Sequence, residues 1–551
     1  MARRKAWSAA LLTLSLLVTA CSGAKTDTSK ANTGTTQQQQ TTQGPKVLTI
    51  GMWSSPSDLD FITNSTSYSS TVISLIYPSL YTINDKLQFE PRLAEKCDVN
   101  ATFDQWTCKI RANAKWTDGT PITADDVAYV YQVIAHPDTP TTRRSLIDTL
   151  KGTDKDGKSV TKDFNLEGVK VIDKQTIQFT TKVPVDPDAF QEKVLSNIYI
   201  MPKSQLEAAV KADLKGLDKQ PLSKTPTVFG GPFKLVSMKD GDSVELAPNP
   251  DYFMGKPKLD KLFIKIVGQQ AFAAAIQKGE IDVAAGNGIG EVPIADWDTV
   301  TALSNVEPVT YTAPSYQYME INSALPEFNN PKVREALAHA INRPLIVQRL
   351  LKGNAEVLNT PLNSINKYYR KDIQSALEYD PAKAKKMLQD AGFDFSKKIV
   401  LLTPTGNTVR EQSADIIQAN LKDIGLNVEI EKVDFNTRQA RAQKGQFQLS
   451  LVGFSATFDP DFSSQISTNG GFNYGKYSNP KMDELLSQGK NLVKFEDRKK
   501  VYDQAQELFV QDVPLVPLYS VKALCVVNKR VIAAKPGPQG LTWNAHLWDV
   551  K

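Results

Sequence analysis

Apolar and polar positions along the chain predict strands and helices that follow one another in turn. Residues 399–403 form an apolar run of strand length, residues 410–424 carry apolar side chains at helical spacing, and residues 428–433 alternate as a strand. Gly425 stands where a left-handed residue can end the helix. This segment predicts one strand–helix–strand unit, and a shorter version of the pattern runs over residues 262–283.

Capping residues mark four predicted helix starts. Asn330, Asp380 and Asn479 each stand directly before a proline, which suits the first helical position because no amide hydrogen is needed there. Thr123 is followed three residues later by Asp126, the pattern of a capping box. Strands and helices that alternate in this way predict an α/β protein whose lobes are built on mixed or parallel sheets.

The first 21 residues predict export from the cytoplasm. Arg3, Arg4 and Lys5 precede an apolar run over residues 9–20, which is about half the length that a membrane-spanning helix needs. The run ends in VTA before Cys21 and resembles the bacterial lipobox, in which the cysteine receives a diacylglycerol. We therefore expect a lipoprotein signal peptide and a lipid anchor on Cys21. A simple membrane anchor or a buried N-terminal helix is the alternative.

Residues 22–46 differ in composition from the rest of the chain. They are mostly Ser, Thr, Gly, Asn, Lys and Gln, with almost no large apolar side chain. Such a stretch cannot offset the entropy of ordering by burial. The composition predicts a flexible linker between lipid and globule, and an ordered N-terminal arm is the alternative.

Length and charge narrow the class of protein further. The chain has 551 residues, enough for several lobes with cores of their own. Its formal net charge of +5 falls to +2 without the three basic residues of the predicted signal peptide. A balance so close to neutral gives no reason to expect a nucleic-acid partner.

The cysteines fit an exported protein. Cys97 and Cys108 flank a polar segment between two short extended runs, so they could face each other across a hairpin and form a disulfide outside the cell. A loop of this size would stabilise the fold by on the order of 3 kcal/mol. Cys525 lies in an apolar run and is expected to be a free buried thiol. No CxxC motif and no clustered histidines indicate a metal site.

Motifs for catalysis or nucleotide binding are weak. The three histidines lie far apart, and neither HExxH nor GxSxG occurs, so we expect no zinc or serine hydrolase. Residues 152–159 match the phosphate-loop pattern, but no buried strand precedes them and no helix is predicted after them. Asp154 and Asp156 would also repel phosphate. We therefore interpret this match as a turn and expect neither a cofactor nor an enzymatic activity.

Seven sequence blocks occur in an order that resembles one family. The most specific is 93–127, with the run WTCKIRANAKWTDGTPITADDV. The other blocks are FGGPFKLV (229–236), NPDYFMGKPKLDKLFIKIV (249–267), IQKGEIDVA (276–284), FNNPKVREALAHAINR (328–343), NYGKYSNPKMDELL (473–486) and VPLVPLYS (513–520). From about residue 47 onward, the chain resembles the family 5 solute-binding lipoproteins of ABC importers for oligopeptides, dipeptides, nickel complexes and some oligosaccharides.

The resemblance implies an α/β fold of the type II periplasmic-binding-protein class, with two hinged lobes and an extra inserted domain. Ligand contacts that exist only in the closed form would shift such a hinge toward closure. The implied crossings between the lobes lie near residues 313–318 and 517–521. The implied division is a signal peptide at 1–21, a linker at 22–46, lobe one at 47–86 with 225–316 and 517–551, the inserted domain at 87–224, and lobe two at 317–516.

The resemblance also implies which residues contact the ligand. They come from an early loop after the first strand, from the hinge, from a motif similar to G-W-x-A-D-Y-x-D-P that is GFSATFDPD here, and from the 473–486 block. The predicted ligand-binding residues are Trp53, Ser54, Ser55, Tyr316, Gln317, Tyr318, Phe454, Thr457, Phe458, Asp459, Asp461 and Asn473. Core packing of the aromatic residues is the alternative.

One departure from the family motif changes the expected ligand chemistry. The aspartate that binds a peptide's amino terminus in peptide-binding members falls on Thr457, which cannot neutralise an ammonium group. Family arginines that bind a peptide carboxylate align near Ala442 and Leu451, which are uncharged. We therefore predict that Asp459 or Asp461 recognises a cation, or that the ligand carries less charge than a free peptide. Turn and capping roles for both aspartates are the alternative.

The implied function is the substrate-binding component of an ABC importer. It would capture a peptide or related solute and deliver it to a complex of permease and ATPase. We expect a monomer that is anchored by lipid to the cell membrane and faces outside. An extracellular signal-peptide receptor or chaperone-like binder without transport is one alternative, and an exported enzyme is another.

Overall fold

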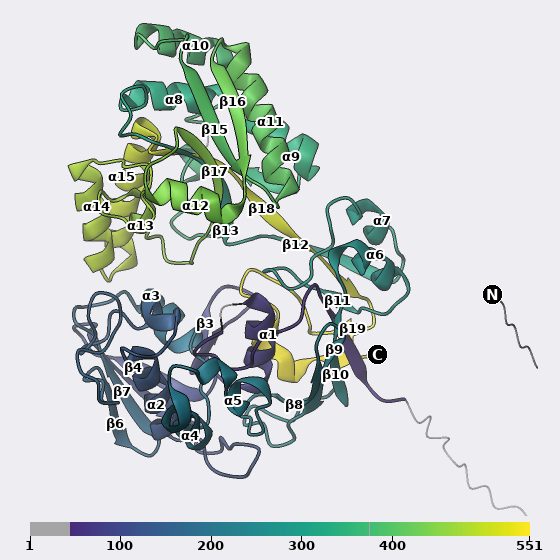
Figure 1. The fold of residues 1–551 in the computed structure, drawn as a ribbon. Helices are drawn as coiled ribbons and strands as arrows, with labels where there is room; N and C mark the ends of the chain where they lie inside the picture. Colours follow the sequence, from purple (N-terminus) through teal and green to yellow (C-terminus); the bar gives the residue numbers. More distant parts are fainter. Residues whose placement is uncertain (1–43, 65, 374) are drawn as a thin grey trace, which may run out of the picture. The chain divides into compact units, whose positions relative to one another are not determined.

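The computed structural model describes residues 44–64, 66–373 and 375–551. The predicted signal peptide, the lipid attachment at Cys21 and nearly all of the predicted linker lie outside the described residues. Figure 1 shows the order of helices and strands along residues 45–551, which belong to one unit of the fold. In the described part of the chain, no helix combines the length and the apolar character needed to span a membrane.

Strand β18 (Leu515–Asn528) belongs to two sheets at once. Its first half pairs antiparallel with β13 (Ser315–Ile321) and β14 (Ala355–Val357), and its second half pairs with β11 (Val283–Ala284) and β12 (Val306–Thr312). The strand is almost continuously apolar, as expected for a strand that is covered on both faces. Only two residues separate β12 from β13, so the chain crosses between the sheets there and again within β18.

Lobe two is the part of the fold whose buried residues lie between positions 316 and 519. Its sheet has the order β16-β15-β17-β13-β18. The predicted strand–helix–strand unit is confirmed: β15 and β16 are parallel, α11 packs on both, and Gly425 has φ +100°. The elements are β15 (Lys398–Pro404), β16 (Asn427–Val433), β17 (Leu449–Ser455), α8 (Pro331–Ala340), α9 (Arg343–Leu351), α10 (Pro381–Asp390), α11 (Thr408–Asp423), α12 (Phe435–Gln443), α13 (Ser463–Ile466), α14 (Pro480–Asn491), α15 (Phe495–Asp512) and η4 (Lys371–Ile373).

Lobe one is built on the sheet β11-β1-β10-β9-β8. Strand β1 is parallel to both of its neighbours, and the remaining pairs are antiparallel. The predicted unit at 262–283 is present, although its second strand is only the two-residue β11. The elements are β1 (Val47–Met52), β8 (Phe233–Lys239), β9 (Ser243–Pro248), β10 (Lys261–Ile266), β19 (Val531–Ile532), β20 (Asp549–Val550), α1 (Ser67–Ile76), α6 (Gln269–Gln277), α7 (Trp297–Thr301) and η5 (Thr542–Leu547).

Residues 87–224, here called the inserted segment, carry a separate antiparallel sheet of order β4-β5-β7-β6. Their buried side chains share one continuous core with lobe one, so both should move as one body. With the adjoining β2, the elements are β2 (Tyr81–Ile83), β3 (Phe89–Pro91), β4 (Ala94–Val99), β5 (Gln105–Ile110), β6 (Val169–Asp173), β7 (Thr176–Thr180), α2 (Ala124–Ala135), α3 (Pro187–Phe190), α4 (Lys203–Asp213), α5 (Pro221–Lys224), η1 (Arg143–Leu146), the π-helical η2 (Gln191–Ser196) and η3 (Leu217–Lys219).

Local contacts explain several of these elements. The Asn330, Asp380 and Asn479 side chains accept hydrogen bonds from backbone amides at the starts of α8, α10 and α14, at 2.9, 2.9 and 2.8 Å. At the start of α2, the Asp126 carboxylate accepts from the Thr123 amide at 2.8 Å. All four predicted helix starts are confirmed.

The expected disulfide and the expected free thiol are both confirmed. Cys97 in β4 faces Cys108 in β5, and a disulfide joins them. Cys525 is buried in β18 as a free thiol.

Candidate functional site

A cavity of about 370 Å³ lies between the inserted segment and lobe two. Volumes of this order are typical of small-ligand pockets. Because its walls belong to two different cores, a hinge motion would open or close it. The inserted segment contributes Ser145, Leu146, Asp148, Glu192, Lys193 and Asn197, and the side chains of lobe two include Tyr316, Leu362, Phe454, Thr457, Asp461, Gln465 and Phe472.

Aromatic side chains form the apolar part of the cavity wall. The antiparallel pairing of β13 and β17 sets Tyr316 opposite Phe454, with ring centroids 6.1 Å apart. Phe472 continues the group at 5.7 Å from Phe454. The Tyr316 hydroxyl donates to Gln465 Oε1 at 2.5 Å, and burial raises the pKa of Tyr316. These rings offer an apolar surface to a ligand group.

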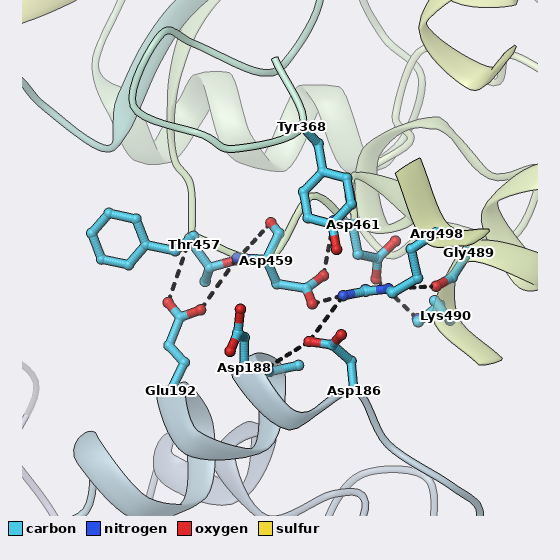
Figure 2. Close-up of polar contacts among 12 residues, drawn as sticks. Asp186, Asp188, Glu192, Tyr368, Thr457, Asp459, Asp461, Gly489, Lys490 and Arg498 are labelled. Carbon is cyan, nitrogen blue, oxygen red and sulfur yellow. Dashed lines mark hydrogen bonds and ion pairs between the residues drawn. The ribbon is translucent and has the colours of Figure 1, made fainter. Parts of the chain in front are cut away.

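Beside the cavity, Arg498 of α15 connects lobe two to the inserted segment. Its guanidinium lies 3.0 Å from Asp459 of lobe two and 3.1 Å from Asp186 at the start of α3 (Figure 2). Its Nε also donates to the Gly489 carbonyl at 2.9 Å. All three charged side chains are buried. Burial lowers the pKa of Arg498, but the two carboxylates outweigh this and raise it, so the side chain stays charged.

Glu192 makes the second connection between the two parts. It lies in the π-helical turn η2, a rare geometry that is frequent at functional sites. Its carboxylate accepts hydrogen bonds from the backbone amides of Phe458 at 3.1 Å and Asp459 at 3.2 Å (Figure 2). Burial raises the pKa of Glu192 to about 7.

An exposed ion pair between Asp188 and Lys367 adds to these bonds. We call the bonds of Asp186, Asp188 and Glu192 to lobe two the cross-lobe contact. A smaller cavity of about 280 Å³ borders it and is lined partly by Phe458. Glu192 and Asp459 line both cavities, so the cross-lobe contact separates the larger cavity from the smaller one.

The two aspartates that were predicted to recognise a cation already have partners. Asp459 pairs with Arg498, and its carboxylate also accepts from the Asp461 amide at 2.9 Å. Asp461 lies 3.2 Å from Lys490 and accepts from the Ser463 amide at 2.9 Å. The contacts with backbone amides are of the turn type that the alternative interpretation expected, and the two ion pairs come in addition. A role for either carboxylate in binding the ligand stays a prediction.

Half of the predicted ligand-binding residues meet at the two cavities. Tyr316, Phe454, Thr457, Asp459 and Asp461 line the larger one. Phe458 lines the smaller one. The Thr457 hydroxyl is bound weakly, donating to the Asp459 carbonyl at 3.3 Å.

The early loop after the first strand, residues 53–55, lies outside both cavities. Trp53 packs edge-on against Phe272 with ring centroids 6.3 Å apart, and it belongs to a core of lobe one. Ser55 accepts a hydrogen bond from the Gly241 amide at 2.7 Å, and Ser54 is exposed. None of Trp53, Ser54 and Ser55 lines either cavity. Their contact with a ligand stays a prediction.

The remaining predicted residues have structural contacts within lobe two. Gln317 accepts from Arg410 Nε at 3.0 Å, and Tyr318 is buried in a core of lobe two. Asn473 donates to the Tyr477 carbonyl at 2.7 Å and accepts from the Tyr477 amide at 3.1 Å, so it holds its own loop. The three do not line the cavities.

Sequence reasoning missed Asp148, Asp186, Glu192, Gln465 and Arg498. Asp186 precedes a proline, the same signal that marked other helix starts, and it does cap α3 by accepting from an amide at 3.0 Å. That signal says nothing of a partner in lobe two. No local pattern distinguishes the other four residues. Within the residues that the structure describes, no group of His, Cys, Asp and Glu could hold a metal ion.

Comparison with known proteins agrees with this geometry. Residues 88–476 match the model of a family described as bacterial extracellular solute-binding proteins, family 5 Middle. The chain is similar to the oligopeptide-binding protein AppA of Bacillus subtilis, at 29% identity over 98% of this chain and 97% of the relative.

Solved structures show the same fold. AppA of Bacillus subtilis in complex with a nonapeptide superposes with a TM-score of 0.73 at 26% identity, covering 92% of this chain and 100% of that chain. The substrate-binding protein CtaP of Listeria monocytogenes has a TM-score of 0.79 at 24% identity, with coverage of 92% and 100%. The fold is therefore that of a type II periplasmic binding protein with two hinged lobes. The chain belongs to the bacterial extracellular solute-binding proteins of family 5.

Proposed function

We propose that this protein is the substrate-binding component of an ABC importer, and that it captures a peptide or a related small solute in the cavity between the inserted segment and lobe two. The observation that carries the proposal is the composition of the cavity wall. Two parts with separate cores supply it, and its aromatic rings are accompanied by carboxylates, two amides and a lysine. Such a wall suits a ligand with both apolar and polar groups.

The nonapeptide complex of AppA supports a peptide as the ligand class. A ligand that touches both walls binds the closed form better than the open one, so it shifts the hinge toward closure. The permease would then recognise the closed protein, accept the ligand and leave an open protein behind. On this proposal the ligand passes through unaltered.

The proposal extends to the parts that surround the cavity. The chain would follow the division set out above, with a signal peptide, a linker, two lobes and an inserted domain, except that Tyr316, Leu518 and Tyr519 pack in the cores of lobe two. The mature protein would be a monomer on the outer face of the cell membrane, held by lipid on Cys21. Trp53, Ser54 and Ser55 would approach the ligand only in another hinge position.

Calorimetric titration of the purified protein with di- to nonapeptides tests the proposal, together with small-angle scattering of the same samples. We expect saturable binding of at least one length class and a smaller radius of gyration on binding. Mass spectrometry of the released ligand should return the original mass. A converted ligand would indicate an enzyme instead, and a complete lack of peptide binding would exclude the proposed ligand class.

A further inference from the structure

Asp148 has a different environment from the other carboxylates that line the cavity. Glu192 accepts from two backbone amides, Asp459 pairs with Arg498, and Asp461 pairs with Lys490. Asp148 Oδ1 is buried without a hydrogen-bond partner. Among the described residues, no ion pair engages this carboxylate.

The backbone around Asp148 is nevertheless well held. Lys182 Nζ donates to the Asp148 main-chain carbonyl at 2.7 Å, and the Thr153 hydroxyl approaches the same oxygen at 3.3 Å. A cation is therefore close by, but it binds the main-chain carbonyl and makes no ion pair with the carboxylate. The residue follows η1 in the inserted segment, and its side chain lines the cavity.

An unpaired carboxylate in this position is costly to the free protein. Burial raises the pKa of Asp148, and the more distant Lys193, Lys490 and Lys182 only partly oppose this effect. A buried ionised group normally acquires a partner of opposite charge. The missing partner is one that a ligand could supply.

A second buried polar group that lacks a good hydrogen bond belongs to Gln465, which lines the same cavity from lobe two. Gln465 is 4% exposed, and its Oε1 accepts the Tyr316 hydroxyl hydrogen. Its Nε2 lies close enough to the Tyr318 phenol to lower the pKa of that group slightly, but it makes no hydrogen bond of good geometry among the described residues. Buried amide groups are almost always paired, so this donor also lacks an acceptor that a ligand could provide.

We propose that Asp148 binds a primary ammonium group of the ligand, and that Gln465 Nε2 donates to a carbonyl oxygen of the same ligand. The inference rests on the proposed function and narrows it to amine-bearing solutes of peptide type. Because Asp148 belongs to the inserted segment and Gln465 to lobe two, both contacts exist together only in the closed form.

Calorimetry with three synthetic peptides of one sequence tests this assignment. The first has a free amino terminus, the second is acetylated there, and the third is acetylated but carries one lysine. The unmodified protein should bind the first roughly 10- to 100-fold more tightly than the second, as expected for a charge-assisted hydrogen bond. Tight binding of the third would show that a lysine side chain can supply the ammonium group.

Asp148→Asn keeps the shape of the side chain and should abolish this preference, while affinity for the acetylated peptide stays the same. Asp163→Asn, at an exposed position of the same segment, is the matched control and should change nothing. Gln465→Met should weaken the binding of the free peptide and of the acetylated peptide by the same factor.

The possible results separate this inference from the proposed function. If Asp148→Asn prefers the free peptide over the acetylated one by the same factor as the unmodified protein, the role of Asp148 is overturned. Peptide binding itself would then remain intact. Tight binding of uncharged solutes together with no peptide binding would overturn both. Circular dichroism of each variant verifies that it is folded.

Discussion

Arg498 of lobe two lies 3.1 Å from Asp186 of the inserted segment, and both side chains are buried. The same guanidinium is held by Asp459 within its own lobe. Opening of the hinge would leave Arg498 with one carboxylate and expose Asp186 to water. The pair therefore biases the hinge toward the arrangement seen here, in which the walls of the cavity face each other.

Asp186→Asn should weaken the closed arrangement by about 1–3 kcal/mol, since it replaces a buried charged partner while Asp459 still holds Arg498. Small-angle scattering without ligand should then show a larger radius of gyration. Asp188→Asn is the control, because the Asp188–Lys367 pair is exposed and should contribute less than about 1 kcal/mol. Equal expansion in both variants would contradict a special role for the buried pair.

Closure of the cavity should depend on pH through Glu192. In the closed form the carboxyl group keeps its proton up to about pH 7, because burial raises its pKa to about 7. In an open cleft it would lose the proton near its ordinary pKa. Closing therefore takes up a proton between these values, so this contribution is complete below the ordinary pKa and is lost as pH rises through about 7. At low pH, Glu192 contributes on the order of 3 kcal/mol to the free energy of closing.

Scattering curves between pH 5 and 8.5 measure this dependence. The closed fraction should fall as the pH rises. Glu192→Gln removes the titrating group, although its amide oxygen can accept only one of the two backbone hydrogen bonds, and it should remove most of the change around pH 7. An unchanged profile in Glu192→Gln would assign the dependence to other groups.

Phe454→Ala should reduce ligand affinity roughly 5- to 30-fold, or about 1–2 kcal/mol, because the ring connects Tyr316 and Phe472 in the apolar wall. Phe435→Ala removes a ring that is 50% exposed and does not line the cavity, so affinity should be unchanged. Calorimetry on both variants gives the comparison. If the two variants bind equally well, the aromatic wall does not contact the ligand.

Asp148→Asn should also make the ligand-free protein more stable, since it removes the charge of a half-buried carboxylate whose Oδ1 has no hydrogen bond to any described residue. We expect the apparent melting temperature to rise by about 1–2 °C. Saturating ligand should stabilise the unmodified protein more than the variant, so that the unmodified protein then has the higher melting temperature. A lower melting temperature in the ligand-free variant would mean that the carboxylate has a stabilising partner.

Much of the local structure could be predicted because its causes lie within a few residues of each other. Asn330 caps the helix that begins beside it, and Gly425 ends the helix that precedes it. The hairpin of Cys97 and Cys108 likewise depends on one short turn. Resemblance to the family added Tyr316 and Phe454, which do line the cavity.

The sequence by itself determined the elements, the hairpin disulfide and the family, and with these the two-lobed fold. Only the tertiary structure decided what each carboxylate does: Glu192 bonds to Phe458, 266 positions away, and Asp459 pairs with Arg498, whereas Asp148 Oδ1 is buried without a hydrogen bond to any described residue. The reason is physical. The behaviour of a charged group depends on burial and on partners within about 4 Å, and these come from distant parts of the chain that only folding brings together.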